Sequence, residues 1–188
     1  MIHLYHGDGK GKTTAAMGLA LRMAGRGRPV VIAQFLKGAD SGERLALARL
    51  PQVTLLPVPE KLKFLFAMTE EERRQEAWRA QELLARAGQA AADPDCGLVV
   101  LDEVCDGVNA GLLPLADLLA LLDGARAEVV LTGRDPAPEL TERADYITHF
   151  QKEKHPYDRG VPARCGVEFY AGPGTKKIYG FFTPDSPA

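Results

Sequence analysis

The residues with the clearest capacity for chemistry form one glycine-rich run, Gly7-Asp8-Gly9-Lys10-Gly11-Lys12-Thr13-Thr14. Glycines let backbone N–H groups turn toward an anion, and a helix that begins beside them adds the positive end of its dipole. Lys12 supplies a mobile positive charge, and a following hydroxyl can join the ligands of Mg²⁺, with Thr13 favoured over Thr14. The run therefore predicts a loop that binds the phosphates of a nucleoside triphosphate.

The spacing of this loop is unusual. Phosphate loops ordinarily have four residues between the first glycine and the Gly-Lys pair, and that spacing would place the first glycine at His6. Here Gly7 begins a loop that is one residue shorter. The alternative, a glycine-rich turn that binds nothing, is disfavoured because the run lies between a predicted strand and a predicted helix.

A pair of acids supplies the second half of the predicted site. Asp102-Glu103 directly follows the apolar run 98–101, as expected for carboxylates at the end of a buried strand that face Mg²⁺. Acids that merely cap a strand end are the alternative. With the phosphate loop present, we expect Thr13, Asp102 and Glu103 to hold the metal, and Lys12, Thr13 and Glu103 to act in catalysis. The sequence has no Asn-Lys-x-Asp segment for reading guanine, which favours adenine.

Alternating apolar runs and helix-forming segments must position these residues. Strands are expected at residues 2–5, 30–35, 53–56, 97–101, 128–132 and 146–150. Helices are expected at residues 12–25, 43–50, 70–92, 115–122 and 136–144. This order predicts an α/β fold, a three-layer P-loop NTPase-like (RecA-like) sandwich with a mainly parallel sheet.

Composition excludes several classes of function. The 188 residues include 23 Lys and Arg against 25 Asp and Glu, so no basic face for nucleic acid is expected. The three cysteines match neither a disulfide framework nor a zinc pair, which favours a reducing compartment. No signal-peptide core and no apolar run of membrane-spanning length is present. We therefore expect a cytoplasmic protein without a membrane partner.

Several further segments join the loop and the acid pair in a wider pattern. They are residues 34–38 (QFLKG), 42–43 (GE), 132–134 (TGR), 154–158 (KHPYD), Gly160, Ala163 and residues 166–169 (GVEF). Together with residues 7–14 and 101–103, this pattern resembles the P-loop corrinoid adenosyltransferases, which act on cob(I)alamin or cob(I)yrinic acid a,c-diamide. The resemblance covers residues 2 to about 169, so we expect one domain over 1–169 and a loop-rich C-terminal tail over 170–188.

The resemblance implies transfer of the 5′-deoxyadenosyl group of ATP to the cobalt(I) of a reduced corrinoid, with release of triphosphate. Lys12, the loop amides and Mg²⁺ would stabilise the departing triphosphate, and Arg134 would reach a phosphate unless it forms a surface ion pair. Two other functions stay open. One is an ordinary P-loop kinase or ATPase, and the other is a non-enzymatic, ATP-dependent corrinoid-binding module.

The expected corrinoid-binding residues are Gln34, Lys37, Phe64, Phe66 and His155. Gln34 and Lys37 end a strand at the edge where α/β sheets bind ligands, with a capping role as the alternative. Many family members have a Phe-x-Trp pair that removes the lower cobalt ligand, whereas this chain has Phe64-Leu65-Phe66. The competing interpretation is that Phe64 and Phe66 are ordinary core residues. For His155, the competing interpretation is a structural or solvated role. The resemblance also implies a homodimer and a reductase or reduced flavin as electron source.

Overall fold

The computed structural model describes residues 1–39, 41–164 and 166–167 and contains one six-stranded sheet. Its strands are β1 (Ile2–His6), β2 (Val30–Gln34), β3 (Val53–Leu55), β4 (Leu98–Asp102), β5 (Glu128–Gly133) and β6 (Tyr146–His149). They lie in the order β3-β2-β4-β5-β1-β6, and every pair is parallel. The predicted α/β fold with a mainly parallel sheet is confirmed. The predicted tail and the third cysteine, Cys165, lie outside the described residues.

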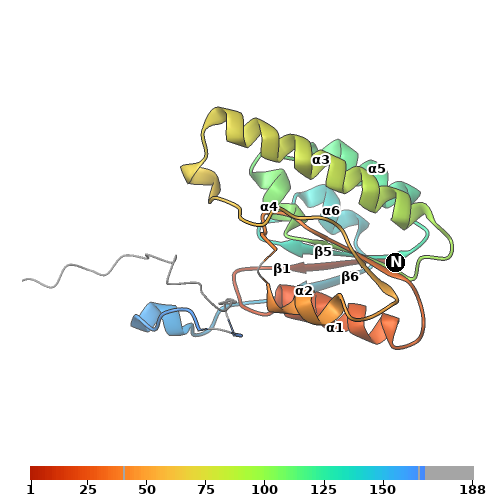
Figure 1. The fold of residues 1–188 in the computed structure, drawn as a ribbon, viewed down its shortest axis with the longest axis horizontal. Coiled ribbons are helices and arrows are strands. Elements are labelled where there is room, and N and C mark those ends of the chain that lie inside the picture. The colour runs from red at the N-terminus through yellow and green to blue at the C-terminus, as the bar shows by residue number, and fades with distance from the viewer. Residues whose placement is uncertain (40, 165, 168–188) are drawn as a thin grey trace, which may run out of the picture.

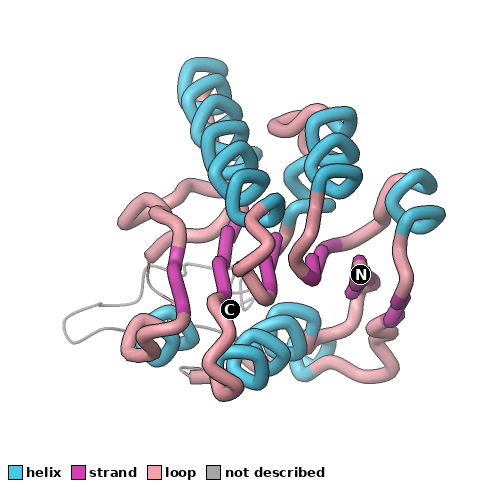
Figure 2. Tube along the Cα trace, turned by 90° about the vertical axis from the view of Figure 1, so that its right-hand side faces the viewer, coloured by secondary structure: helices cyan, strands magenta, loops and turns pink. Residues whose placement is uncertain are grey.

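Helices cover both faces of the sheet and give three layers, which Figure 1 shows edge-on and Figure 2 from the side. The α-helices are α1 (Lys12–Ala24), α2 (Gly42–Leu47), α3 (Glu70–Ala92), α4 (Val104–Asn109), α5 (Leu115–Gly124) and α6 (Pro138–Arg143). Helices α1 and α2 lie on one face, and α3 to α6 lie on the other. Two short 3₁₀ helices, η1 (Leu65–Ala67) and η2 (Pro156–Arg159), interrupt loops. None of the described helices combines the length and apolar composition that crossing a membrane requires.

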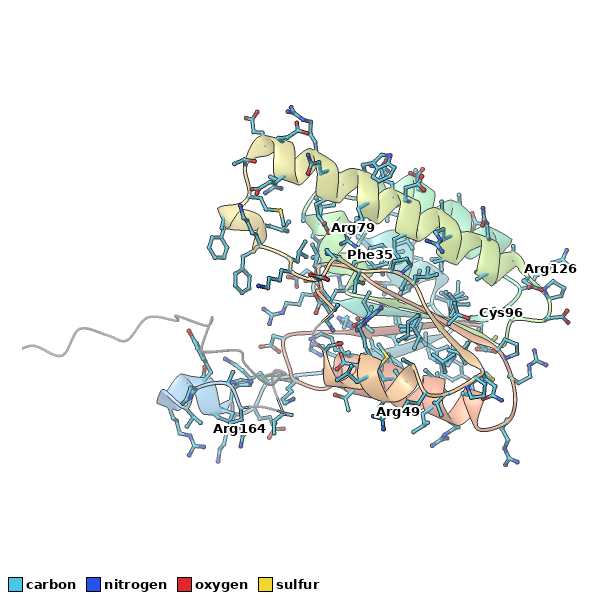
Figure 3. All side chains as sticks on the ribbon, in the orientation of Figure 1. Phe35, Arg49, Arg79, Cys96, Arg126 and Arg164 are labelled. Carbon is cyan, nitrogen blue, oxygen red and sulfur yellow. The ribbon has the colours of Figure 1, made fainter. Side chains whose placement is uncertain are left out.

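The core consists of two apolar layers, because successive side chains of a strand point to opposite faces of the sheet. In β4, Val99 and Leu101 belong to the layer beneath α3 and α5, whereas Leu98 and Val100 pack on the α1 side. Both faces of the central strands are therefore buried, which explains why they read as continuous apolar runs. Figure 3 shows Phe35, just after β2, among these core side chains.

All expected strands and helices are present, and their ends agree within three residues. The sequence reading missed α4, η1 and η2. Helix α4 has the sequence VCDGVN, which combines β-branched residues and glycine and so has low intrinsic helix propensity. Packing compensates for that propensity, since Val104 and Cys105 are buried against the sheet.

The two described cysteines should resist alkylation in the folded protein. Burial raises the pKa of Cys105 to about 12 and also raises the pKa of Cys96, and both side chains are buried. Since the thiolate is the reactive form, iodoacetamide at pH 8 should leave both unmodified over an hour. Peptide mass spectrometry checks this, with urea-unfolded protein as the positive control. Rapid labelling of Cys105 in the folded protein would contradict this burial.

Candidate active site

The predicted phosphate loop and acid pair meet at the carboxyl edge of the sheet, where parallel α/β sheets bind their ligands. Strand β1 leads into the loop and β4 ends in Asp102, with β5 between them. The same end of the molecule carries the loop with η1 on one side and the segment with η2 on the other (Figure 1). Segments far apart in the sequence therefore border one region.

The phosphate loop is held by the chain that follows β6. The Gly9 N–H donates to the carbonyl of Phe150 at 2.6 Å, and the Lys152 N–H donates to the Asp8 carboxylate at 3.0 Å. Gly7 has φ 116°, and a Cβ there would lie 2.4 Å from the Phe150 carbonyl oxygen. Glycine is therefore required at Gly7 both for its backbone conformation and for this close approach.

Lys12 lies folded into the loop. Its ammonium donates to the carbonyls of Gly7 at 2.6 Å and Gly9 at 3.0 Å. Burial lowers the pKa of Lys12, and the nearby positive charge of Arg134 lowers it further. Arg134 itself is exposed, and its backbone N–H donates to the Asp106 carboxylate at 3.2 Å. Two positive groups are thus available to one anion at this loop.

The N-terminus of α1 is prepared for an anionic ligand rather than for a capping side chain. Its N-cap is Gly11, with φ 120°, and its first turn contains no acid. Helix α3 differs, because Thr69 and Glu72 form a reciprocal cap and its first turn contains three glutamates. Acids of its own first turn thus face the positive dipole end in α3, whereas α1 has no such acid and could accept an anion there.

Asp102 is fully buried and accepts four hydrogen bonds. Its Oδ1 accepts from the hydroxyls of Thr13 at 2.9 Å and Thr132 at 2.8 Å, and its Oδ2 accepts from Gln34 at 3.1 Å and Lys37 at 2.6 Å. Burial alone would raise the pKa of Asp102, but the charge and hydrogen bonds of its partners outweigh it and lower the pKa. The carboxylate is therefore ionised at neutral pH.

Glu103 has a different environment. Burial raises its pKa to about 7, opposed by Lys37 and reinforced by Asp102 and Asp106. Its backbone is left-handed, with φ 61°, as is that of Leu36 (54°) after β2. Such conformations cost about 1–3 kcal/mol each and cluster at functional sites.

Gln34 is placed differently from its expected corrinoid contact. The side chain is fully buried, its amide nitrogen donates to Asp102, and its amide oxygen accepts from Arg44 at 3.0 Å. Arg44 also donates to the carbonyl of Leu56 at 3.0 Å. This placement supports the alternative capping role, in which Gln34 orients the carboxylate, and gives no surface for direct corrinoid contact.

Phe64 and Phe66 form an exposed aromatic pair beside η1. Their rings stack with centroids 5.5 Å apart and planes 10° apart, and the residues are 52% and 85% exposed. The interpretation of both as core residues is therefore wrong. Two stacked, exposed rings offer an apolar surface of the kind that an apolar ligand can cover.

His155 caps η2, because its Nδ1 accepts from the Tyr157 N–H at 3.2 Å. The residue is half-buried and also borders a hollow of about 470 Å³ beside the phosphate loop. The lining residues are Lys10, Gln151, Lys152, Glu153, Lys154 and His155. Positive charge predominates there, so the hollow suits an anionic group.

Thr14 is exposed in the first turn of α1.

Three residues of the site were missed by sequence reasoning. Asp106 contacts the Arg134 backbone, Thr132 bonds Asp102, and Asn109 donates to the carbonyl of Arg134 at 3.0 Å. Thr132 lies in the TGR segment of the recognised pattern, which is a usable signal. Asp106 and Asn109 lie on α4, which was not predicted, so no signal was available for them.

The donor set fits a magnesium ion that arrives with a triphosphate. A hydroxyl (Thr13) and two carboxylates (Asp102, Glu103) are the hard oxygen ligands that Mg²⁺ prefers. Within the described part of the chain, no three His, Cys, Asp or Glu side chains cluster closely enough to hold a metal. Phosphate oxygens and water would therefore complete the coordination, as is usual for this ion.

Comparison with known proteins gives a consistent result. The family model described as ATP:corrinoid adenosyltransferase BtuR/CobO/CobP matches residues 1–169. A corrinoid adenosyltransferase of Pseudomonas aeruginosa is 37% identical over 172 residues, covering 90% of this chain and 83% of that protein. The Escherichia coli K12 corrinoid adenosyltransferase is 31% identical, covering 90% and 85%, and the Salmonella typhimurium corrinoid adenosyltransferase CobA is 30% identical, also covering 90% and 85%.

Proposed function

Because the chain belongs to the ATP:corrinoid adenosyltransferase family, we propose that residues 1–169 transfer the 5′-deoxyadenosyl group of ATP to the cobalt of a reduced corrinoid. Two electrons of cobalt(I) form the cobalt–carbon bond while the bond between C5′ and the triphosphate oxygen breaks. The triphosphate leaves with the electron pair of the broken C5′–O bond. The corrinoid brings its own nucleophile, so the protein has to align the reactants and stabilise the leaving group.

The phosphate loop and its neighbours would stabilise the leaving group. Lys12 and the loop N–H groups would bind the triphosphate, and Arg134 would add a second positive charge as the bond breaks. Asp102 would hold Thr13 in position through their 2.9 Å hydrogen bond. Mg²⁺, when bound by Thr13, Asp102 and Glu103, would supply further positive charge to the departing triphosphate.

The observation that carries the proposal is the joining of the loop to the acid strand by the Thr13–Asp102 hydrogen bond, at the same end of the molecule as the loop that carries an exposed aromatic pair (Figure 1). The test mixes the protein with ATP, MgCl₂ and a chemically reduced corrinoid under anaerobic conditions. Adenosylcorrinoid and triphosphate should form in equal amounts. Orthophosphate or ADP as the only products would instead identify an ATPase or kinase. Tight binding of both substrates without turnover would identify a binding module.

The corrinoid would lie against Phe64 and Phe66, where an apolar surface excludes water and a lower ligand from cobalt. We still expect Lys37 and His155 to contact the polar side chains of the corrinoid. A four-coordinate cobalt is easier to reduce, so this surface would also support the electron transfer that precedes the reaction.

Replacing Phe66 by alanine should impair corrinoid use without destabilising the protein. We expect the KM for the corrinoid to rise about tenfold, the equivalent of about 1.4 kcal/mol of lost contact. The free energy of unfolding should change by no more than about 0.5 kcal/mol, because the side chain is exposed. Steady-state kinetics and urea unfolding measure the two quantities. Trp78→Ala, which removes an exposed aromatic ring from α3, is the matched control, and an equal KM change there would contradict the assignment.

The family resemblance supports three further proposals. Mg²⁺ is the metal that accompanies ATP, the enzyme acts as a cytoplasmic homodimer, and a reductase or reduced flavin supplies the electrons that generate cobalt(I). The donor set at Thr13, Asp102 and Glu103 supports the first of these.

A further inference from the structure

The ammonium of Lys37 occupies the position between the expected metal ligands. It lies 2.6 Å from Asp102 Oδ2, 3.1 Å from Thr13 Oγ1 and 3.5 Å from Glu103 Oε1. Thr13 lies in α1, Asp102 ends β4 and Glu103 is the next residue. Oxygens from these three residues thus surround one positive charge. An ammonium in such a cage takes the electrostatic place of a metal cation.

The hydrogen bonds show that the ammonium of Lys37 engages the same oxygens that a metal ion would use. The Thr13 hydroxyl donates its proton to Asp102 and accepts from Lys37, so the ammonium engages one of the two lone pairs of this oxygen. Asp102 Oδ2 accepts from Lys37 and from Gln34, while Oδ1 accepts from two hydroxyls. A metal ion cannot reach either Thr13 or Asp102 Oδ2 on this side while the ammonium stays in place.

Among the four donors to Asp102, Lys37 is the one whose charged group can move away from the carboxylate. Gln34 is fully buried, whereas the Lys37 side chain retains 20% exposure at the end of a flexible four-carbon stem. Departure of Lys37 without a replacement would leave a buried carboxylate without a counter-charge, which is strongly unfavourable. Departure in exchange for a divalent cation keeps that carboxylate neutralised.

We propose that Lys37 is the resident counter-ion of the magnesium site, and that Mg²⁺ enters by displacing it. This inference rests on the proposed function, since it takes Mg²⁺ as the metal that accompanies ATP. The exchange makes metal binding weak in the nucleotide-free protein, because each ion must compete with a tethered one. A bound triphosphate favours the exchange by offering the released ammonium a new anionic partner. Metal and nucleotide therefore bind as one unit.

The test measures metal binding to the nucleotide-free protein. Mn²⁺ binding is followed by electron paramagnetic resonance for wild type, Lys37→Ala and Lys37→Gln, with no ATP or corrinoid present. Both variants should bind Mn²⁺ at least about tenfold more tightly than wild type, because the competing charge is gone. Their melting temperatures should be lower without metal and should rise more on addition of Mg²⁺. Arg49→Ala, which removes an exposed positive charge from the segment after α2, should behave like wild type (Figure 3).

Unchanged or weaker Mn²⁺ binding by both variants would overturn the proposal and leave Lys37 as a simple substrate contact. A second measurement uses the wild-type protein and does not depend on how the variants fold. Saturating Mn²⁺ should increase acetylation of Lys37 by acetic anhydride several-fold, while acetylation of the exposed Lys63 stays constant. Equal protection of Lys37 with and without metal would refute displacement. Neither assay requires turnover, so failure of adenosyl transfer and failure of this exchange give different results.

Discussion

Replacing Lys12 by alanine should lower kcat/KM for ATP by about a hundredfold to a thousandfold, the loss typical of removing one group that stabilises a developing charge. Lys12 is the ammonium inside the phosphate loop, held by the carbonyls of Gly7 and Gly9. The triphosphate gains negative charge as its bond to C5′ breaks, so the lost interaction is one that strengthens in the transition state. Corrinoid binding should change by less than about twofold, because the expected corrinoid contacts lie outside the loop.

The measurement pairs steady-state kinetics with equilibrium corrinoid binding. Arg49→Ala controls for the loss of one positive charge, because Arg49 is exposed and outside the site. An equal loss of ATP use and corrinoid binding would contradict the role given to Lys12. Loss of corrinoid binding alone would place the corrinoid, rather than the triphosphate, at the loop.

Replacing Asp102 by alanine should destabilise the metal-free protein by about 3–5 kcal/mol, because the change leaves a positive charge without its partner. Lys37 would lose its shortest ion pair, and Thr13, Thr132 and Gln34 would lose a shared acceptor. Activity should fall as well, since Thr13 would no longer be held. Asp102→Asn should destabilise less, because it keeps the shape of the side chain and one acceptor.

Urea unfolding at several pH values separates this effect from simple cavity formation. The pKa of Asp102 is lowered in the folded protein, so its contribution is present above the unfolded pKa of about 3.9 and is lost as the pH falls through the lower folded value. The difference between wild type and Asp102→Ala should therefore be full at pH 7 and shrink in strong acid. Asp123→Ala removes an exposed acid that pairs with Arg143 at 3.2 Å and should cost less than about 1 kcal/mol. Equal losses in the two variants would contradict the buried network.

The fold was predictable because its signals are local. Continuous apolar runs such as residues 98–101 are typical of strands buried on both faces, and Thr69 and Glu72 mark the start of helix α3. Helix α4 was not predictable, because contacts with the sheet rather than its own composition stabilise it. The loop and the acid pair were predictable for the same reason as the strands, since each is one short contiguous motif.

The arrangement around these motifs depends on contacts that no local pattern encodes. Gln34 ends β2 and Lys37 follows it three residues later, so both have the same role expected from the sequence. Gln34 is nevertheless fully buried, whereas the Lys37 side chain is 20% exposed. The left-handed backbone at Leu36 lies between them, and a leucine gives no warning of such a conformation. The hydrogen bonds to Asp102 likewise join α1, β2, β4 and β5, which only the sheet order brings together.

The attachment of the phosphate loop to Phe150 and Lys152 has a consequence for biosynthesis. The ribosome makes the loop before its supports, which lie about 140 residues further along the chain, as does β6, which pairs with β1. A nascent chain that ends before β6 carries the complete motif and lacks the scaffold that shapes it. The ability to hold nucleotide should thus arise late in synthesis, so incomplete chains released by a stalled ribosome would not sequester ATP.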